Sequence, residues 1–292
     1  MPFTLIQFFK CIRYTEVLIF QVPPFLGIAF SIPSLWDEWL SIALFVFGNI
    51  CLFVQIFAFN DLGDIDIDNK DVNKYESTFT KKGVSRRQML QMTVALTGLV
   101  LFVFSTFGVT TFLLALVMLA LGFLYSHPRF SQKRIPIVAS INHFVGGVTM
   151  FLLGYSLFSE IDLRGIAISL YFAVVLVSGH LCQEVRDYDQ DTLNCANTSA
   201  VRFGKRRIFL VAFSLFMFSF GYFAWLVKLS IFPLAWIYAV VLVPVIATGF
   251  IYAWKTPLSF HDVCRFQVQY RLVYALITVV MLLSLLSTPV AS

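Results

Sequence analysis

The chain has 292 residues, of which 59% are hydrophobic and 13% are charged, and its formal net charge is +5. Soluble globular domains carry about twice that share of charged residues, so the composition excludes a soluble fold and favours a protein embedded in a bilayer. The five cysteines are scattered without a Cys-x-x-Cys pair, which argues against a disulfide framework or a thiolate metal site.

Nine apolar segments follow one another along the chain. Each is long enough to cross a bilayer, which takes about 20 mainly apolar residues in a helix. Their apolar runs are continuous, whereas the strands of a membrane β-barrel would alternate, and backbone groups in lipid must be satisfied within the segment. We therefore predict an all-α, multi-pass membrane protein with one domain over residues 1–292. The predicted spans are 14–31, 40–60, 88–106, 107–125, 136–157, 166–184, 207–227, 233–254 and 269–288.

The cationic residues predict the orientation of these spans. All Lys and Arg residues except Arg164 and Lys228 fall on the side that holds the N-terminus and the loops after the even-numbered spans. By the positive-inside rule this side is cytoplasmic and the C-terminus lies outside, and we place the protein in a bacterial inner membrane. The positive charge then belongs to one face, so we expect anionic lipid or phosphorylated substrates as partners, and no nucleic acid.

Three cytoplasmic loops, at about 61–87, 126–135 and 185–206, are predicted to carry the function. Two of them open with the same acidic spacing. The first reads Asn60-Asp61-x-x-Asp64-x-x-x-Asp68, and the second reads Gln183-Glu184-x-x-Asp187-x-x-x-Asp191. Acids at i, i+3 and i+7 share one helical face within about 60°, whereas Asp66 and Asp189 lie off that face.

Carboxylates crowded beside hydrocarbon invite a divalent cation, and hard oxygen ligands suit Mg²⁺ shared with substrate phosphates. Two such faces could hold two Mg²⁺ ions bridged by a diphosphate. The alternative for one motif alone is a solvated acidic helix end. The repeat extends into a Gly flanked by cations after each motif, which suggests two related modules, although the similarity outside the acids could be chance. The predicted metal ligands are Asn60, Asp61, Asp64, Asp68, Glu184, Asp187 and Asp191.

Further polar residues have two interpretations each. Arg129, Lys133 and Arg134 follow the fourth span, where they either grip a diphosphate or simply anchor the topology. Arg186 either contacts a phosphate or neutralises a neighbouring acid. His180 stands one turn before Glu184 and is either a chamber residue or a packed, hydrogen-bonded histidine.

These motifs together resemble the UbiA superfamily of intramembrane prenyltransferases. The pattern from Asn60 to Asp68 matches the family's first motif at every defined position, and Asp187-x-x-x-Asp191 matches its second. Tyr125-Ser126 followed by Lys133-Arg134 resembles the family's tyrosine–lysine motif in its longer-spaced form. Nine helices also agree, so the resemblance covers nearly the whole chain and implies a single bundle around a lipid-facing central chamber.

The resemblance implies roles for individual residues. Asn60, Asp64 and Asp68, supported by Asp61, would form the first metal and diphosphate set, and Asp187 and Asp191 the second. Tyr125 and Lys133 would contact the diphosphate. Glu184 rests on the internal repeat alone. Arg13 resembles a basic residue that the family often has at the start of its first helix, but Tyr14-Thr15-Glu16 follows where many members have proline.

The sequence thus predicts a Mg²⁺-dependent transfer of an isoprenyl group from a polyprenyl diphosphate to a lipophilic acceptor, a class that includes aromatic acceptors. Catalysis would rest on Asp64, Asp68, Asp187, Asp191 and Lys133. Related alternatives are phosphoribosyl transfer to a polyprenyl phosphate and terpene cyclisation, which would use the same acids. A cation transporter is the alternative from another class, although transporters usually place their acids near the bilayer midplane. The oligomeric state is left open.

Overall fold

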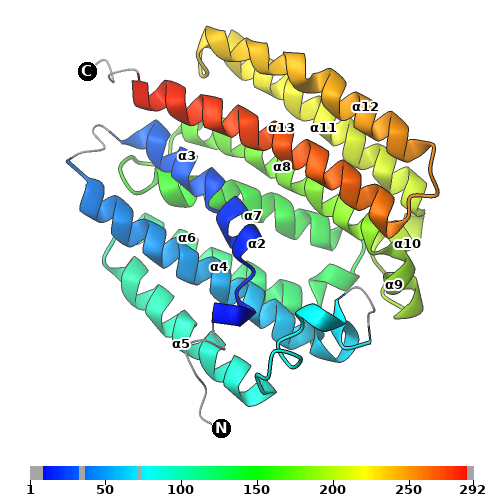
Figure 1. Ribbon diagram of the computed structural model, residues 1–292. Helices are drawn as coiled ribbons and strands as arrows, with labels where there is room; N and C mark the ends of the chain where they lie inside the picture. The colour runs from blue at the N-terminus through cyan, green and yellow to red at the C-terminus, as the bar shows by residue number, and fades with distance from the viewer. Residues whose placement is uncertain (1–8, 33–36, 71–73, 288–292) are drawn as a thin grey trace. The chain divides into compact units, whose positions relative to one another are not determined.

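Every regular element in the described part of the chain is a helix. The computed structural model describes residues 9–32, 37–70 and 74–287 (Figure 1). Nine helical segments among these residues are long and apolar enough to cross a bilayer, which confirms the predicted all-α membrane fold. They are Tyr14–Ser31, Trp39–Asp68, Arg86–Ser105, Val109–Ser126, Val138–Tyr155, Leu163–Arg186, Lys205–Lys228, Leu234–Trp254 and Phe260–Leu285.

Contacts divide the chain into two compact units, and each unit contains one acidic motif. The first unit comprises residues 1–132 and 153–159, and the second comprises residues 133–152 and 160–292. That the whole chain acts as one domain around a central chamber stays a prediction.

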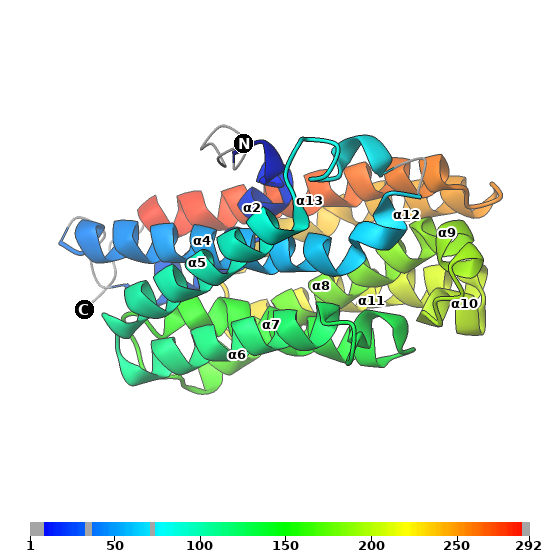
Figure 2. The same ribbon diagram turned by 90° about the horizontal axis from the view of Figure 1, so that it is seen from below.

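The first unit is built around α4 (Trp39–Asp68), which packs along α5 (Arg86–Ser105) and α6 (Val109–Ser126) (Figures 1 and 2). The short 3₁₀ helix η1 (Tyr75–Ser77) lies in the loop that follows α4. The α4–α5 contact buries Phe45 against Phe104, with ring centroids 5.7 Å apart. Ser85 and Gln88 form a capping box that begins α5.

The first span consists of two helices, α2 (Tyr14–Ile19) and α3 (Val22–Ser31). Pro23 and Pro24 stand in the first turn of α3. Proline has no backbone N–H to donate to the preceding turn, so a helix tolerates it at its start but not in its interior. The prolines therefore explain why the span breaks between Ile19 and Val22.

The acids of the first motif lie on the last turns of α4. This helix has 30 residues and is about 45 Å long, whereas the hydrocarbon core of a bilayer is about 30 Å thick. The apolar part of the helix, from Trp39 to Phe59, is enough to cross that core. The end that carries Asn60 to Asp68 can therefore stand beyond the hydrocarbon while remaining part of a rigid spanning helix.

The second unit contains α7 (Val138–Tyr155) up to Leu152, α8 (Leu163–Arg186), α11 (Lys205–Lys228), η3 (Leu234–Leu242), α12 (Val243–Trp254) and α13 (Phe260–Ser287). Two short helices, α9 (Tyr188–Leu193) and α10 (Ser199–Phe203), connect α8 to α11. Phe209 lies between Phe250 of α12 and Phe266 of α13, at centroid distances of 5.0 and 5.3 Å. These aromatic contacts join α11, α12 and α13 in one core.

The last span begins at Phe260 rather than at residue 269 as predicted. Ser259 donates from its backbone N–H (2.9 Å) and its hydroxyl (2.7 Å) to the Asp262 carboxylate, and Asp262 N–H donates to the Ser259 hydroxyl (3.3 Å). This reciprocal pair begins the helix early. The polar residues between Asp262 and Arg271 lower the local hydropathy, so the apolar pattern of the sequence did not indicate this earlier start.

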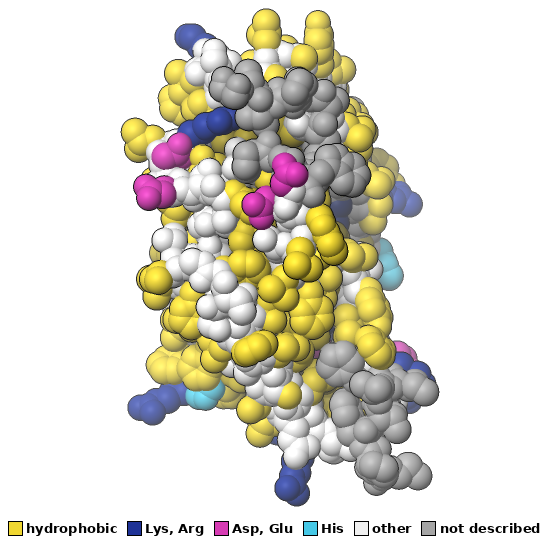
Figure 3. Space-filling view, turned by 90° about the vertical axis from the view of Figure 1, so that its left-hand side faces the viewer, with side chains coloured by type: hydrophobic (Ala, Val, Ile, Leu, Met, Phe, Trp, Pro, Cys, Tyr) yellow, Lys and Arg dark blue, Asp and Glu magenta, His cyan; other side chains and the backbone are white. Residues whose placement is uncertain are grey.

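Large apolar side chains are exposed along these helices, among them Phe102 (70%), Val109 (74%), Tyr238 (76%) and Leu283 (63%). Figure 3 shows one face of the molecule, on which apolar side chains make up much of the surface. Exposed apolar area on this scale is a liability in water and suits contact with lipid chains.

Candidate prenyl-diphosphate site

The first acidic motif lies on one uninterrupted helix. Because α4 continues through Asp68, the three acids Asp61, Asp64 and Asp68 share a face, as their spacing predicts. Asp66 lies off this face: its side chain is 79% exposed and its Oδ2 atom is 3.5 Å from a guanidinium nitrogen of Arg86. The helix thus separates Asp66 from the acids that can act together.

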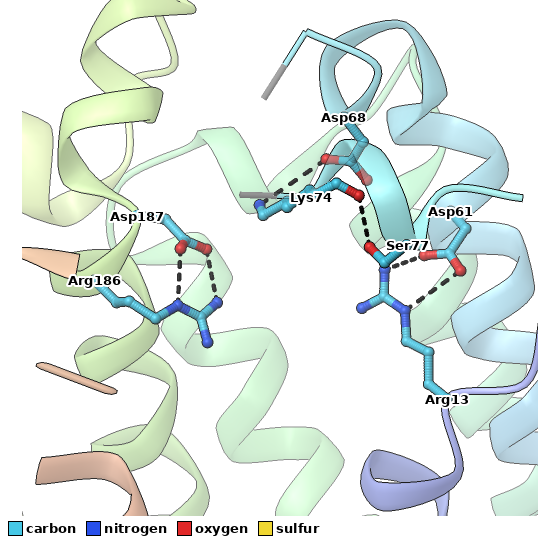
Figure 4. Close-up of polar contacts among 7 residues, drawn as sticks. All are labelled: Arg13, Asp61, Asp68, Lys74, Ser77, Arg186 and Asp187. Atoms are coloured by element: carbon cyan, nitrogen blue, oxygen red, sulfur yellow. Dashed lines mark hydrogen bonds and ion pairs between the residues drawn. The ribbon is translucent and has the colours of Figure 1, made fainter. Parts of the chain in front are cut away.

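Two cations from outside α4 pair with acids of this face (Figure 4). Arg13 forms a two-pronged contact with Asp61, in which Nε lies 3.3 Å from Oδ2 and a second nitrogen binds Oδ1. Lys74 places Nζ 3.9 Å from Oδ1 of Asp68. Partial burial disfavours the charged form of Arg13, but the charge of Asp61 and its hydrogen bonds outweigh this effect and raise the pKa of Arg13. The carboxylates of the first motif therefore attract positive charge from other segments.

The end of α6 lies against the middle of the same motif. The hydroxyl of Ser126 donates to Oδ1 of Asn60 at 3.0 Å. A Cβ atom on Gly63 would stand 2.6 Å from the backbone carbonyl oxygen of Ser126, so the absence of a side chain at residue 63 allows this close approach. The contact brings Tyr125, the neighbour of Ser126, to the same end of the unit as the motif.

Replacing Gly63 by Ala is expected to destabilise the first unit by about 1–3 kcal/mol, because a backbone oxygen cannot move aside as a flexible side chain can. Thermal unfolding in detergent measures the effect. Gly98→Ala is the matched control: Gly98 is also inside a spanning helix, but its added Cβ would meet nothing within 4 Å. Equal unfolding temperatures for the two variants would contradict the tight α4–α6 contact.

The second acidic motif differs from the first, because its helix is interrupted. Glu184 lies on α8, which ends at Arg186, and Asp191 lies on α9, which begins at Tyr188. Asp187 stands between the two helices with φ −89° and ψ 3°, outside helical geometry. The expectation that Glu184, Asp187 and Asp191 share one continuous helical face is therefore wrong, and the equivalence of Glu184 with Asp61 does not extend to local structure.

Each aspartate of the second motif has its own polar partner. Arg186 donates from Nε (2.8 Å) and a terminal nitrogen (2.9 Å) to the two oxygens of Asp187, as Figure 4 shows. Asp191 accepts a hydrogen bond from the Thr198 hydroxyl at 3.3 Å. Asp189 is 69% exposed and lies 3.6 Å from Lys205. The sequence predicted that Arg186 either contacts a phosphate or neutralises a neighbouring acid. The described contacts include its ion pair with the neighbouring Asp187.

Glu184 and His180 are buried rather than open to a ligand. Their relative exposures are 5% and 4%, and His180 Nε2 lies 3.2 Å from Glu184 Oε1. The ring of His180 stacks on that of His143, with centroids 3.8 Å apart. Both histidines therefore belong to a packed polar cluster inside the second unit.

The remaining predicted residues lie in and around the loop after α6. Tyr125 is in the last turn of α6, and Arg129 is exposed in the loop. Lys133 and Arg134 lie in the short 3₁₀ helix η2 (Gln132–Arg134) and are half-buried. By the division of the chain, Tyr125 and Arg129 belong to the first unit, and Lys133 and Arg134 to the second.

Comparisons with known proteins identify the family. A family profile described as UbiA prenyltransferase family matches residues 22–266. The chain belongs to the UbiA prenyltransferase family. Comparison with curated protein sequences gives no match.

Solved structures of UbiA homologues share the fold. A homologue from Archaeoglobus fulgidus bound to GPP and Mg²⁺ is similar with a TM-score of 0.74 and 19% identity, covering 97% of this chain and 100% of that one. A UbiA homologue from Archaeoglobus fulgidus bound to DMAPP and Mg²⁺ gives a TM-score of 0.73 and 19% identity, with 97% of this chain and 99% of that one covered. The apo structure of a homologue from Aeropyrum pernix K1 gives 0.67 and 16%, with 92% and 98% covered.

The donor set of this UbiA chain fits Mg²⁺. It consists of carboxylate and amide oxygens, the hard ligands that Mg²⁺ prefers. The guanidinium groups on Asp61 and Asp187 and the ammonium group near Asp68 show that these oxygens already attract cations. In the described ranges no three His, Cys, Asp or Glu side chains converge on a point that could hold a metal.

Several residues that hold the two motifs in place had no predicted role. Ser126 was seen beside Tyr125, but its bond to Asn60 depends on how α4 and α6 pack. Thr198 and Ser199 stand in a Thr-Ser pair that typically begins a helix, and this capping signal was available in the sequence. Their contacts with Asp191 and Glu184 were not, because seven and fifteen residues separate the partners.

Proposed function

We propose that this protein transfers an isoprenyl group from a polyprenyl diphosphate to a lipophilic acceptor within the membrane, with Mg²⁺ as its cofactor. The observation that carries the proposal is the face of Asp61, Asp64 and Asp68 on the end of α4, paired with cations and belonging to a chain of the UbiA family. The homologues bound to Mg²⁺ with GPP or DMAPP support the same donor chemistry.

The metal ligands in this proposal are oxygens of both motifs. Asn60, Asp64 and Asp68 would hold one ion with Asp61 in support, and Asp187 and Asp191 would hold the other. Bound Mg²⁺ would neutralise the diphosphate and lower the barrier to its departure. Tyr125, Arg129, Lys133 and Arg134 supply donors and positive charge for the diphosphate oxygens.

The reaction breaks the bond between C1 of the isoprenyl chain and the diphosphate oxygen, and the electron pair leaves with pyrophosphate. The acceptor atom forms the new bond to C1 and loses a proton to the released pyrophosphate. The carbon left by ionisation must be shielded from water until the acceptor attacks. The apolar helices, rich in aromatic side chains that can stabilise a cation, suit that task. The site and its loops are proposed to face the cytoplasm, with the C-terminus outside, in a bacterial inner membrane.

The direct test uses the purified protein in lipid nanodiscs with labelled isoprenyl diphosphates and extracted cell lipids. We expect label to enter the lipid fraction and pyrophosphate to be released, both only with Mg²⁺. Label transferred from a phosphoribosyl donor, or a labelled hydrocarbon formed without any acceptor, would replace prenyl transfer by one of the related reactions. Metal flux into proteoliposomes without any isoprenoid would instead indicate a transporter.

Lys133→Ala is expected to reduce turnover by about 10-fold or more, because it removes a positive charge that would stabilise the leaving diphosphate. Lys133→Arg is expected to restore only part of this loss, since a guanidinium is larger and presents a fixed fork. Donor affinity and turnover are the measurements. Lys255→Ala is the control, because Lys255 is an exposed lysine of the same unit outside the proposed site. Equal activity of the two Ala variants would reduce Lys133 to a topological anchor.

A further inference from the structure

Both oxygens of the Glu184 carboxylate already contact neighbouring groups of the protein. Its Oε2 atom accepts a hydrogen bond from the Ala200 backbone N–H at 3.0 Å, and its Oε1 atom accepts one from the Ser199 hydroxyl at 3.4 Å. His180 lies 3.2 Å from the same Oε1 atom. Both carboxylate oxygens therefore point to neighbouring protein groups at a position that is 5% exposed.

This environment does not suit a Mg²⁺ ligand. Mg²⁺ gives up its water reluctantly and usually keeps several water molecules when it binds a protein carboxylate. A carboxylate that is 5% exposed and already faces the Ala200 backbone N–H, the Ser199 hydroxyl and the His180 ring is not open to such a hydrated ion. If Glu184 turned away to bind a metal ion, the Ala200 N–H would also lose its hydrogen-bond acceptor inside the protein. An unsatisfied buried N–H group costs free energy.

The same short segment reaches Asp191. Thr198 caps α10 by accepting from Val201 N–H at 3.5 Å, and its hydroxyl donates to Asp191 Oδ2 at 3.3 Å. Thr198, Ser199 and Ala200 are consecutive. Glu184 therefore binds the last two residues of this segment, and the first residue binds Asp191. The position of the Asp191 carboxylate thus depends on where Glu184 fixes the start of α10.

Ser199 also fixes the residues that follow Lys133 and Arg134. Its Oγ atom accepts from Ile137 N–H at 3.1 Å. Ile137 has φ 68°, a left-handed conformation that is strongly disfavoured for a β-branched residue. Such a conformation persists where surrounding contacts impose it, and the bond to Ser199 is one such contact.

We infer that Glu184 is a positioning residue: through Ser199, Ala200 and Thr198 it places the Asp191 carboxylate for Mg²⁺ binding, and it does not itself bind the metal. We call the residues Glu184, Thr198, Ser199 and Ala200 the α10 latch. The inference rests on the proposed function, because it assigns Asp191 to a metal-binding role.

The test compares Glu184→Gln, Thr198→Val and Thr198→Ser in the full-length protein. Thermal stabilisation by Mg²⁺ with inorganic pyrophosphate reports binding without any turnover, and a Mg²⁺ titration of prenyl transfer reports activity. Gln keeps an oxygen that can accept from Ala200 N–H, so Glu184→Gln should need no more than about 3-fold more Mg²⁺ for half-maximal stabilisation. Val removes the hydroxyl that binds Asp191, so Thr198→Val should need about 10-fold more, and Ser should restore the wild-type value.

Each other outcome contradicts a defined part of the inference. If Glu184→Gln raises the Mg²⁺ requirement as much as Asp191→Asn, Glu184 is a metal ligand. If Thr198→Val binds Mg²⁺ and pyrophosphate as the wild type does, the α10 latch does not control Asp191. If Thr198→Ser fails to restore binding, the effect of Val is a general loss of packing. If the wild type itself is not stabilised by Mg²⁺ and pyrophosphate, the proposed function fails together with the latch.

Discussion

Asp64→Asn is expected to reduce prenyl transfer by at least about 10²-fold while the protein stays folded in detergent. Asp64 lies at the centre of the acidic face of α4, between Asp61 and Asp68. Asn has nearly the same shape as Asp but lacks the charge that would hold Mg²⁺ against the diphosphate, so the loss should fall on transition-state stabilisation. Turnover at saturating donor and Mg²⁺, with thermal unfolding measured in parallel, separates this effect from misfolding.

Asp66→Asn is the matched control for this variant. The same chemical change is made two residues further along the same helix, on a side chain that is 79% exposed and pairs with Arg86. We expect near-normal turnover, because an exposed ion pair contributes little to stability and Asp66 faces away from the site. If Asp66→Asn proves as damaging as Asp64→Asn, the assignment of the metal-binding face is wrong.

Asp191→Asn is the second change with a large expected effect, again about 10²-fold or more in turnover, because it removes the proposed charge on the second ion. Asp187→Asn should behave similarly and should also release the fork of Arg186. Stabilisation by Mg²⁺ and pyrophosphate should weaken in both variants. Asp189→Asn is the control, since Asp189 is 69% exposed and pairs with Lys205.

The outcome for the second motif decides whether the acidic repeat is functional. Full activity of Asp187→Asn and Asp191→Asn, combined with an inactive Asp64→Asn, would mean that only the first motif binds metal. The similarity of the two motifs would then be a structural resemblance without shared chemistry.

The sequence predicted the membrane fold and the first motif because simple physical rules determine both. A bilayer requires continuous apolar segments of a certain length, so all nine spans were visible in the sequence. The first motif could be placed because α4 is continuous, and helical spacing then gives the shared face directly.

The second motif was predicted less well because its geometry depends on tertiary contacts. Neither Gly nor Pro marks the break of the helix at Asp187. The prediction therefore assumed that helical spacing continues through Asp187 as it does in α4. Glu184 was predicted as a ligand from its place in the repeat. Its actual partners lie in α10, and nothing in the spacing of the acids indicates them.

The length of α4 has a consequence for how this protein can change. The acids are rigidly connected to the apolar residues Trp39 to Phe59, so any inserted residue there is transmitted to them. One added residue would turn the acidic face by about 100° and move it outward by about 1.5 Å, whereas exchanging one apolar side chain for another would do neither. We therefore expect this stretch to accept many substitutions but almost no insertions or deletions, and a library of single-residue insertions along α4 would reveal that asymmetry directly.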